Sequence, residues 1–140
     1  MSDGPLRRMT GSEVWCAREA LGLERSDLGR LLGNRAEIVR DWERGKLNVP
    51  FRVREQMDEL EAITAKEVER LTTDLQQMPQ PVVVVYLDKE QQPPAVARFG
   101  VRWWRAVAAR AAANVPGTRI GTAAEIDAIS HEGSATEIND

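Results

Sequence analysis

Six residues between positions 35 and 44 carry the side-chain chemistry that stands out most in this sequence. An arginine can make paired hydrogen bonds to O6 and N7 of guanine, a carboxylate can accept from N4 of cytosine, and a small side chain can pack on the methyl group of thymine. Displayed on one helix face, such a set could contact base-pair edges, although charged helix faces are often simply solvated. The set is Arg35, Ala36, Glu37, Arg40, Asp41 and Arg44.

Residues for metal, redox or nucleophilic chemistry are scarce. Cys16 is the only cysteine and cannot form an intramolecular disulfide or a thiolate cluster, and the only histidine, His131, lies in a polar tail. The clustered carboxylates at 58–61 fit a solvated helix face, and no phosphate-binding glycine loop is present. We therefore expect no catalytic residues, no metal site, no cofactor and no enzymatic activity.

Three short helices are predicted between Thr10 and Gly45. Thr10 and Glu13 have the spacing of a capping box, which opens the first helix. Gly22 ends this helix, Gly33 ends the second, and Gly45 ends the third. The inner faces of the first and third helices carry apolar residues at helical spacing, namely Val14, Ala17 and Leu21 in the first and Ile38, Val39 and Trp42 in the third.

A longer helix is predicted over residues 51–78. Pro50 lies near its first turn, a favourable place for proline. Its apolar positions recur at spacings of three and four and need a partner surface. They are Val53, Met57, Leu60, Thr64, Val68, Leu71, Leu75 and Met78.

The segment from Met9 to Leu60 resembles a known DNA-binding family. The runs Leu28-Gly29-Arg30-Leu31-Leu32-Gly33 and Ile38-Val39-Arg40-Asp41-Trp42-Glu43-Arg44-Gly45-Lys46 resemble the Cro/C1, or xenobiotic-response-element type, helix-turn-helix. The resemblance implies a DNA-binding domain over residues 1–62, in which Val39 and Trp42 anchor a recognition helix whose opposite face enters the major groove. The set at positions 35 to 44 then becomes the predicted base-contacting face.

The same resemblance implies two groups of phosphate contacts. Arg25 and Ser26 would contact DNA from the second helix, and Lys46 and Asn48 from the loop after the third. This chain departs from the family pattern at Arg25 and Ser26, at Gly29, where alanine is common, and at Asp41, which places an acid near DNA. Gly29 costs about 1 kcal/mol of helix stability relative to alanine unless close packing requires it.

The second half of the chain has a different pattern. Pro79-Gln80-Pro81 ends the long helix, and strands are predicted over 82–87 and 95–99, followed by a helix over 101–113. Residues 79–120 would form a β-β-α domain, and residues 121–140 an acidic, partly disordered tail with one short helix around 123–129. The expected fold class is α+β, mostly α.

The β-β-α unit is the expected dimerisation domain. Its layout is similar to that of anti-CRISPR-associated autorepressors of phages and mobile elements, whose C-terminal unit makes the homodimer. The strand at 82–87 could pair across a two-fold axis. The adjacent Trp103 and Trp104 fit a dimer core or a domain core better than an aromatic ligand pocket. The predicted interface residues are Val83, Val85, Phe99, Trp103, Trp104 and Val107.

Charge is unevenly distributed along the chain. The net charge of −3 divides into +2 for residues 1–55, −4 for 56–78, +4 for 79–120 and −5 for 121–140. Mildly basic blocks therefore remain free to face phosphate. No apolar run approaches the roughly 20 residues of a membrane span, and the N-terminus lacks the features of a secretory signal, so we expect a cytoplasmic protein without membrane association.

Together these features predict a homodimeric transcriptional repressor. It would bind double-stranded DNA at an inverted-repeat operator and autoregulate its own operon, such as an anti-CRISPR operon. The alternative is an antitoxin, in which the same helix-turn-helix autoregulates while the C-terminal part binds a toxin partner. RNA binding has no sequence-specific support.

Overall fold

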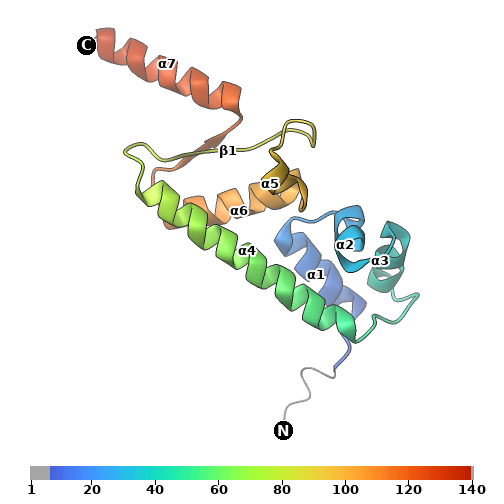
Figure 1. Ribbon diagram of the computed structural model, residues 1–140. Helices are drawn as coiled ribbons and strands as arrows, with labels where there is room; N and C mark the ends of the chain where they lie inside the picture. Colours follow the sequence, from blue (N-terminus) through green and yellow to red (C-terminus); the bar gives the residue numbers. More distant parts are fainter. Residues whose placement is uncertain (1–6, 140) are drawn as a thin grey trace. The chain divides into compact units, whose positions relative to one another are not determined.

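The described part of the chain is mostly helical and contains one small two-stranded sheet (Figure 1), so the predicted α+β, mostly α class is confirmed. The computed structural model describes residues 7–139, without the side chains of Ala95 and of residues 133–139. The chain forms two compact units, Met1–Lys66 and Glu67–Asp140. The division thus follows Lys66, whereas we expected the first domain to end at residue 62.

The first unit contains the three predicted short helices, α1 (Gly11–Leu21), α2 (Arg25–Leu32) and α3 (Ala36–Glu43). The capping box of α1 is present, since Thr10 Oγ1 accepts from the Glu13 N–H at 3.0 Å and Glu13 Oε1 accepts from the Thr10 N–H at 2.8 Å. This bond from the Thr10 backbone holds the pKa of Glu13 below its ordinary value. Gly22 and Gly33 end α1 and α2 in the left-handed conformation, with φ of 72° and 77°.

The core of the first unit lies among the inner faces of these helices and the start of the next. Van der Waals contact here is close enough to exclude a side chain at Gly11, where a Cβ would lie 1.9 Å from the Trp42 carbonyl oxygen. Helices α1 and α3 therefore approach each other at backbone distance. The buried apolar residues include Val14, Leu21, Leu23, Leu28, Leu32, Val39, Trp42, Val49, Val53 and Met57.

Helix α4 (Arg52–Gln76) is the predicted long helix, two residues shorter at its C-terminal end than expected. Its apolar stripe is buried from Val53 to Leu75, while Met78, beyond the helix, is exposed. The one polar member of the stripe, Thr64, donates its hydroxyl to the Leu60 carbonyl at 2.7 Å, which satisfies the buried group within the helix. The helix continues across the division between the two units.

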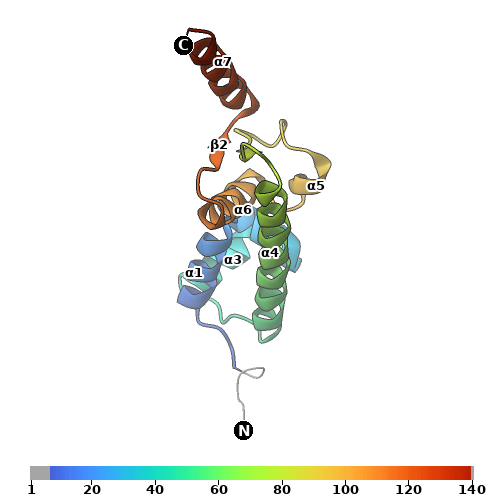
Figure 2. The ribbon, with the colours of Figure 1, turned by 90° about the vertical axis from the view of Figure 1, so that its left-hand side faces the viewer.

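The second unit contains β1 (Val82–Val84), α5 (Pro94–Ala97), α6 (Val101–Asn114), β2 (Arg119–Gly121) and α7 (Ala123–Asn139). The two strands lie side by side and are parallel, with Val82 opposite Arg119 and Val84 opposite Gly121 (Figure 2). The predicted helix over 101–113 is confirmed as α6. The intervening chain makes the crossover that a parallel pair requires.

The prediction of a second strand over 95–99 is wrong, and so is the β-β-α order. Pro93 is the N-cap of α5 and Pro94 its first residue, positions that suit proline because its ring presets a helical φ and no N–H is needed. The partner of β1 is instead β2, from a segment that we assigned to the end of the domain and the tail. The first strand is also shorter than the predicted 82–87.

The tail holds more helix than expected. The short helix predicted around 123–129 is present as the start of α7, which continues to Asn139. Glu125 caps its beginning, since the Thr122 N–H donates to Glu125 Oε1 at 2.8 Å and Thr122 Oγ1 accepts from the Glu125 N–H at 3.2 Å. The predicted disorder at the end of the tail falls partly on Asp140, which lies outside the described residues.

An aromatic cluster of Phe99, Trp103 and Trp104 lies in the core of the second unit. The rings of Phe99 and Trp103 are 4.6 Å apart between centroids, and the indole Nε1 of Trp104 donates to the Val84 carbonyl at 2.7 Å. This hydrogen bond occupies the edge of β1 that faces away from β2, where we expected a partner strand across a two-fold axis. The side chains of α6 therefore cover part of that edge.

The residues predicted for the dimer interface lie mostly in the core of the single chain. Five of the six interface residues are buried within the single chain, and Val85 is half-buried. A side chain that is already buried in its own core has little surface left for a partner. The aromatic pair thus takes the domain-core role that we had considered alongside a dimer role. The five residues are Val83, Phe99, Trp103, Trp104 and Val107.

Candidate nucleic-acid interface

A tight glycine-containing turn holds α2 and α3 together. The Asn34 N–H donates to the Gly29 carbonyl at 2.7 Å, and a Cβ on Gly29 would lie 2.6 Å from the Asn34 carbonyl oxygen. Gly29 is thus required by the close approach of the turn, which explains its place in the middle of a short helix. Gly33, with a φ of 77°, allows the chain to reverse into α3.

Helix α3 has distinct inner and outer faces. Val39 and Trp42 are 0% and 2% exposed and anchor the inner face. With 3.6 residues per turn, the five predicted base-contacting residues from Ala36 to Arg44 fall within an arc of roughly 140° on the other side. Arg35 precedes this arc as the N-cap of the helix. The structure therefore brings five of the six predicted residues to one face, and Arg35 lies outside this face at the start of the helix.

The outer face of α3 carries mixed charge. The side chains of Arg35 and Glu37 are 81% and 58% exposed, with Nε and Oε2 3.9 Å apart. Arg40 and Asp41 are less exposed, and Arg40 Nε lies 3.6 Å from Asp41 Oδ1. Neither of these two buried atoms has a hydrogen-bond partner among the described residues, so this pair can be rearranged by a ligand that offers better geometry.

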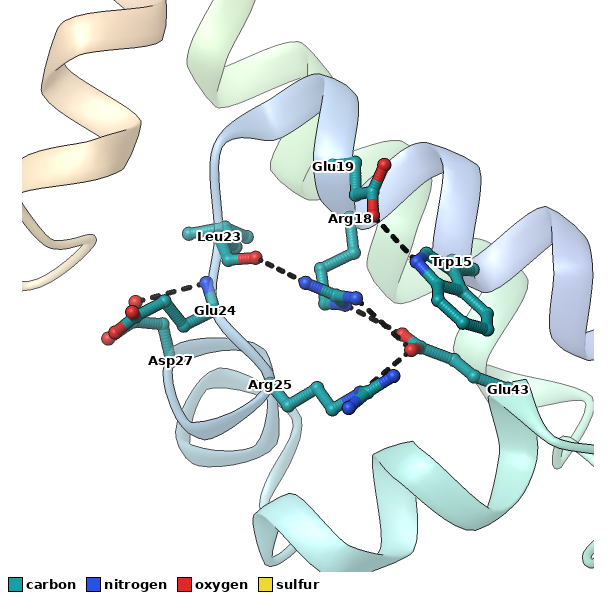
Figure 3. Close-up of polar contacts among 8 residues, drawn as sticks. All are labelled: Trp15, Arg18, Glu19, Leu23, Glu24, Arg25, Asp27 and Glu43. Atoms are coloured by element: carbon teal, nitrogen blue, oxygen red, sulfur yellow. Dashed lines mark hydrogen bonds and ion pairs between the residues drawn. The ribbon is translucent and has the colours of Figure 1, made fainter.

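A buried ion-pair network fixes the C-terminal end of α3 (Figure 3). The carboxylate of Glu43 is fully buried and accepts from Arg18 twice, at 2.6 Å from Nε and at 3.1 Å from Nη2. Arg25 Nε donates to the same carboxylate at 2.9 Å. Arg18 Nη1 also donates to the Leu23 carbonyl at 3.0 Å. The network therefore joins α1, the following turn, α2 and α3 at one carboxylate.

Arg25, predicted as a phosphate contact, has a structural partner that the sequence analysis did not identify. Besides its bond to Glu43, its guanidinium lies over the ring of Trp15 at 5.2 Å from the centroid, and Trp15 in turn donates to Glu19 at 2.6 Å. The Arg25 side chain is 30% exposed. Part of its surface still faces solvent, while its position is set from inside.

The other predicted phosphate contacts lie at the surface. Ser26 is exposed in the first turn of α2, and Lys46 and Asn48 are exposed in the loop after α3. Asp27 is buried and accepts from the Glu24 N–H at 3.2 Å in a second capping box. Because acidic groups already use donors at the start of α2, fewer of its backbone N–H groups remain for an anion.

The loop after α3 and the first turn of α4 carry further polar and aromatic contacts. Arg52 Nη2 donates to Asn34 Oδ1 at 3.3 Å, and Arg54 Nε donates to the Arg7 carbonyl at 3.0 Å. Phe51 is 51% exposed beneath the guanidinium of Arg8. Arg54 therefore holds the N-terminal segment, and the cations around Phe51 lie on the surface of the first unit.

No protein-family model matches the chain. A search of curated proteins also gives no significant match. The resemblance to the Cro/C1 helix-turn-helix rests on the residues named above, and we base the functional proposal on the geometry of α2 and α3. Within residues 7–139, no helix has both the length and the apolar character needed to cross a bilayer.

The buried network was missed, although the sequence contained a signal for it. Glu43 falls next to Val39 and Trp42 on the inner side of the third helix, and Arg18 falls between Val14 and Leu21 on the inner side of the first. A charged residue on an inner face needs an opposite charge, because an unpaired buried charge is very costly. Two opposite charges on two inner faces predict an ion pair.

Proposed function

We propose that the protein is a sequence-specific DNA-binding transcriptional repressor. The observation that carries this proposal is the outer face of α3, where exposed arginines and acceptors share one arc of a helix that is anchored by Val39, Trp42 and the buried Glu43. A helix displayed in this way has the dimensions to enter a major groove, which is wide enough to admit it.

The base contacts follow from the side-chain types on this face. Arg35 and Arg40 would each make paired hydrogen bonds to guanine, and Glu37 would accept from N4 of cytosine. Arg44 would approach the groove from the last turn of α3. In the free protein Asp41 would partly neutralise Arg40. Arg40 could leave it for a base, because the distance of 3.6 Å between Arg40 Nε and Asp41 Oδ1 is too long for a hydrogen bond. Ala36 would pack on a thymine methyl group.

Phosphate contacts would fix the orientation of α3 in the groove. Lys46 and Asn48 are exposed directly after the helix, and Ser26 and the solvent-facing part of Arg25 lie at the start of α2. Such contacts supply affinity without reading sequence. Their number sets the salt dependence, because each neutralised phosphate releases counterions.

The protein would act as a homodimer in the cytoplasm. Two copies of α3 would reach successive major grooves on one side of an inverted repeat, with half-sites about 34 Å apart. Binding over a promoter would block transcription sterically, and the promoter of its own operon, such as an anti-CRISPR operon, is the expected site.

A mobility-shift experiment tests the proposal. The DNA is the upstream region of the protein's own gene, and the wild type is compared with Arg40→Ala at two salt concentrations. We expect a complex that weakens by orders of magnitude at the higher salt and by roughly 10-fold or more in the variant, since a paired arginine–guanine contact contributes about 1–3 kcal/mol. Ser12→Ala, exposed on α1, is the control. Absence of a complex would contradict the proposal and favour the antitoxin alternative.

A further inference from the structure

Within the part of the chain that the structure describes, the main contacts of helix α7 are with the two short strands β1 and β2. In both ribbon views the helix runs away from these strands (Figures 1 and 2). A helix of this length has little stability in water by itself, because most helical stability in proteins comes from packing of an apolar face. The described part of α7 therefore has a face available for a partner.

A groove follows this face. It has a volume of about 730 Å³ and lies between the start of α7, the segment before β1 and the segment before β2. Its walls mix apolar side chains with the polar side chains of Gln80, Arg119 and Ser130, so both apolar burial and polar contacts can hold a partner there. The lining includes Pro79, Pro81, Val82, Pro116, Ile126 and Ile129.

The charges of the groove and the helix are complementary between two copies. Arg119 lines the groove, is exposed, and has no ion pair among the described residues. Glu125, Asp127 and Glu132 are exposed on α7. Residues 79–120 have a net charge of +4 and residues 121–140 a net charge of −5. An acidic α7 from a second molecule thus fits a groove that offers a cation.

We propose that this α7 groove is the homodimer interface. Helix α7 of each copy lies in the groove of the other about a two-fold axis, with Ile126 and Ile129 against the partner's prolines and the acidic side chains near the partner's Arg119. The surface is accessible, unlike the buried aromatic cluster that includes Trp103 and Trp104. The inference rests on the proposed function only for the requirement of two copies on an inverted repeat.

Sedimentation equilibrium of the full chain tests the interface. We expect a dimer for the wild type and an increase of at least about 100-fold in the dimer dissociation constant for Ile126→Asp combined with Ile129→Asp, because burying two carboxylates against apolar walls costs several kcal/mol. The control is Ala128→Asp, which adds the same kind of charge at an exposed position, roughly 160° around the helix from Ile126 and roughly 100° from Ile129. A dimer that persists in the double variant, or a monomeric wild type, overturns the proposal.

Two further measurements keep the result interpretable. Near-ultraviolet circular dichroism reports on the Trp103 and Trp104 environment, and an unchanged spectrum shows that the monomeric variant is folded. Arg119→Glu should weaken the dimer by up to about fivefold, as expected of a surface ion pair, with a smaller effect at high salt. An Arg119→Glu dimer as tight as the wild type, or a loss of affinity that is the same at low and high salt, would contradict the charge arrangement.

Failure of the interface and failure of DNA binding give different results. A monomeric wild type that still binds a single half-site through Arg40 overturns the α7 interface and leaves the recognition helix intact. A wild-type dimer that dissociates on substitution of Ile126 and Ile129 but binds no DNA supports the interface and overturns the proposed function.

Discussion

Different interactions stabilise the interior of each of the two units. In the first unit, a buried carboxylate with two arginine partners and backbone contacts at Gly11 and Gly29 fix the relative positions of three short helices. In the second unit, an aromatic cluster and the alanine-rich α6 pack beside two strands of three residues each. A buried polar network and close backbone contacts allow few relative positions of the helices, whereas apolar packing is non-directional and allows more.

The difference matches the task proposed for each unit. A recognition helix must keep its side chains in register with base pairs, so an anchored α3 suits the first unit. The second unit would supply a partner surface, for which apolar area and complementary charge suffice. Substitutions in the first unit should therefore change geometry and DNA binding together, while those in the second should change stability or association.

The largest expected effect in the first unit comes from removing its central carboxylate. Glu43→Ala leaves Arg18 buried without its partner, and we expect a loss of about 3–5 kcal/mol in the free energy of unfolding. Urea denaturation measures this loss. Glu37→Ala, on the exposed face of the same helix, is the control and should change stability by no more than about 0.5 kcal/mol. Equal effects of the two variants would show that the network is not what holds α3.

Replacing Gly29 by alanine tests whether the added side chain stabilises or destabilises the protein. In an open helix, Gly29→Ala would stabilise the protein by about 1 kcal/mol. Because the added Cβ would meet the Asn34 carbonyl oxygen at 2.6 Å, we expect destabilisation of about 1–3 kcal/mol instead. Thermal unfolding followed by circular dichroism decides between the two. A raised melting temperature would mean that the turn is looser than described.

In the second unit, the hydrogen bond of the Trp104 indole can be tested by substitution. Trp104→Phe keeps an aromatic ring but leaves the Val84 carbonyl without the donor at 2.7 Å, and we expect a loss of about 1–3 kcal/mol in the free energy of unfolding. DNA affinity of the folded variant should be unchanged for a single half-site. A variant as stable as the wild type would show that water replaces the indole at this strand edge.

The smallest effect concerns pH and the start of α1. The Thr10 N–H lowers the pKa of Glu13 in the folded state, so the ionised cap contributes stability above the pKa of the unfolded chain, and this contribution disappears as the pH falls through the lowered value. Glu13→Gln keeps a capping side chain without the charge. Its melting temperature should be below that of the wild type at neutral pH, and the difference should vanish at low pH. A difference that persists there would contradict the assignment.

The first unit could be predicted from sequence because its signals are local. The capping box at Thr10 and Glu13, the glycines at 22 and 33, and the spacing of Val39 and Trp42 each determine a helix boundary or face within a few residues. The outer face of α3 follows from the same periodicity. The ion pairs of Glu43 were missed because their partners are distant in sequence.

The second unit was harder to predict because its sheet pairs distant segments. Nothing near Val82 indicates that its partner is Arg119, and a three-residue strand carries almost no periodicity. The segment at 95–99 contains β-branched and aromatic residues, but Pro93 and Pro94 start a helix there. The tryptophans were correctly seen as core candidates, whereas burial within one chain could not be separated from burial between two.

Selection of preferred sites from a random duplex pool tests the central claim, that the outer face of α3 reads DNA sequence. Wild type and Arg40→Ala are selected in parallel, with melting temperatures confirming that both are folded. We expect an inverted repeat for the wild type and, for the variant, the same repeat with a guanine preference lost at one position in each half-site. No enriched sequence for the wild type, or an identical preference for both proteins, would contradict it.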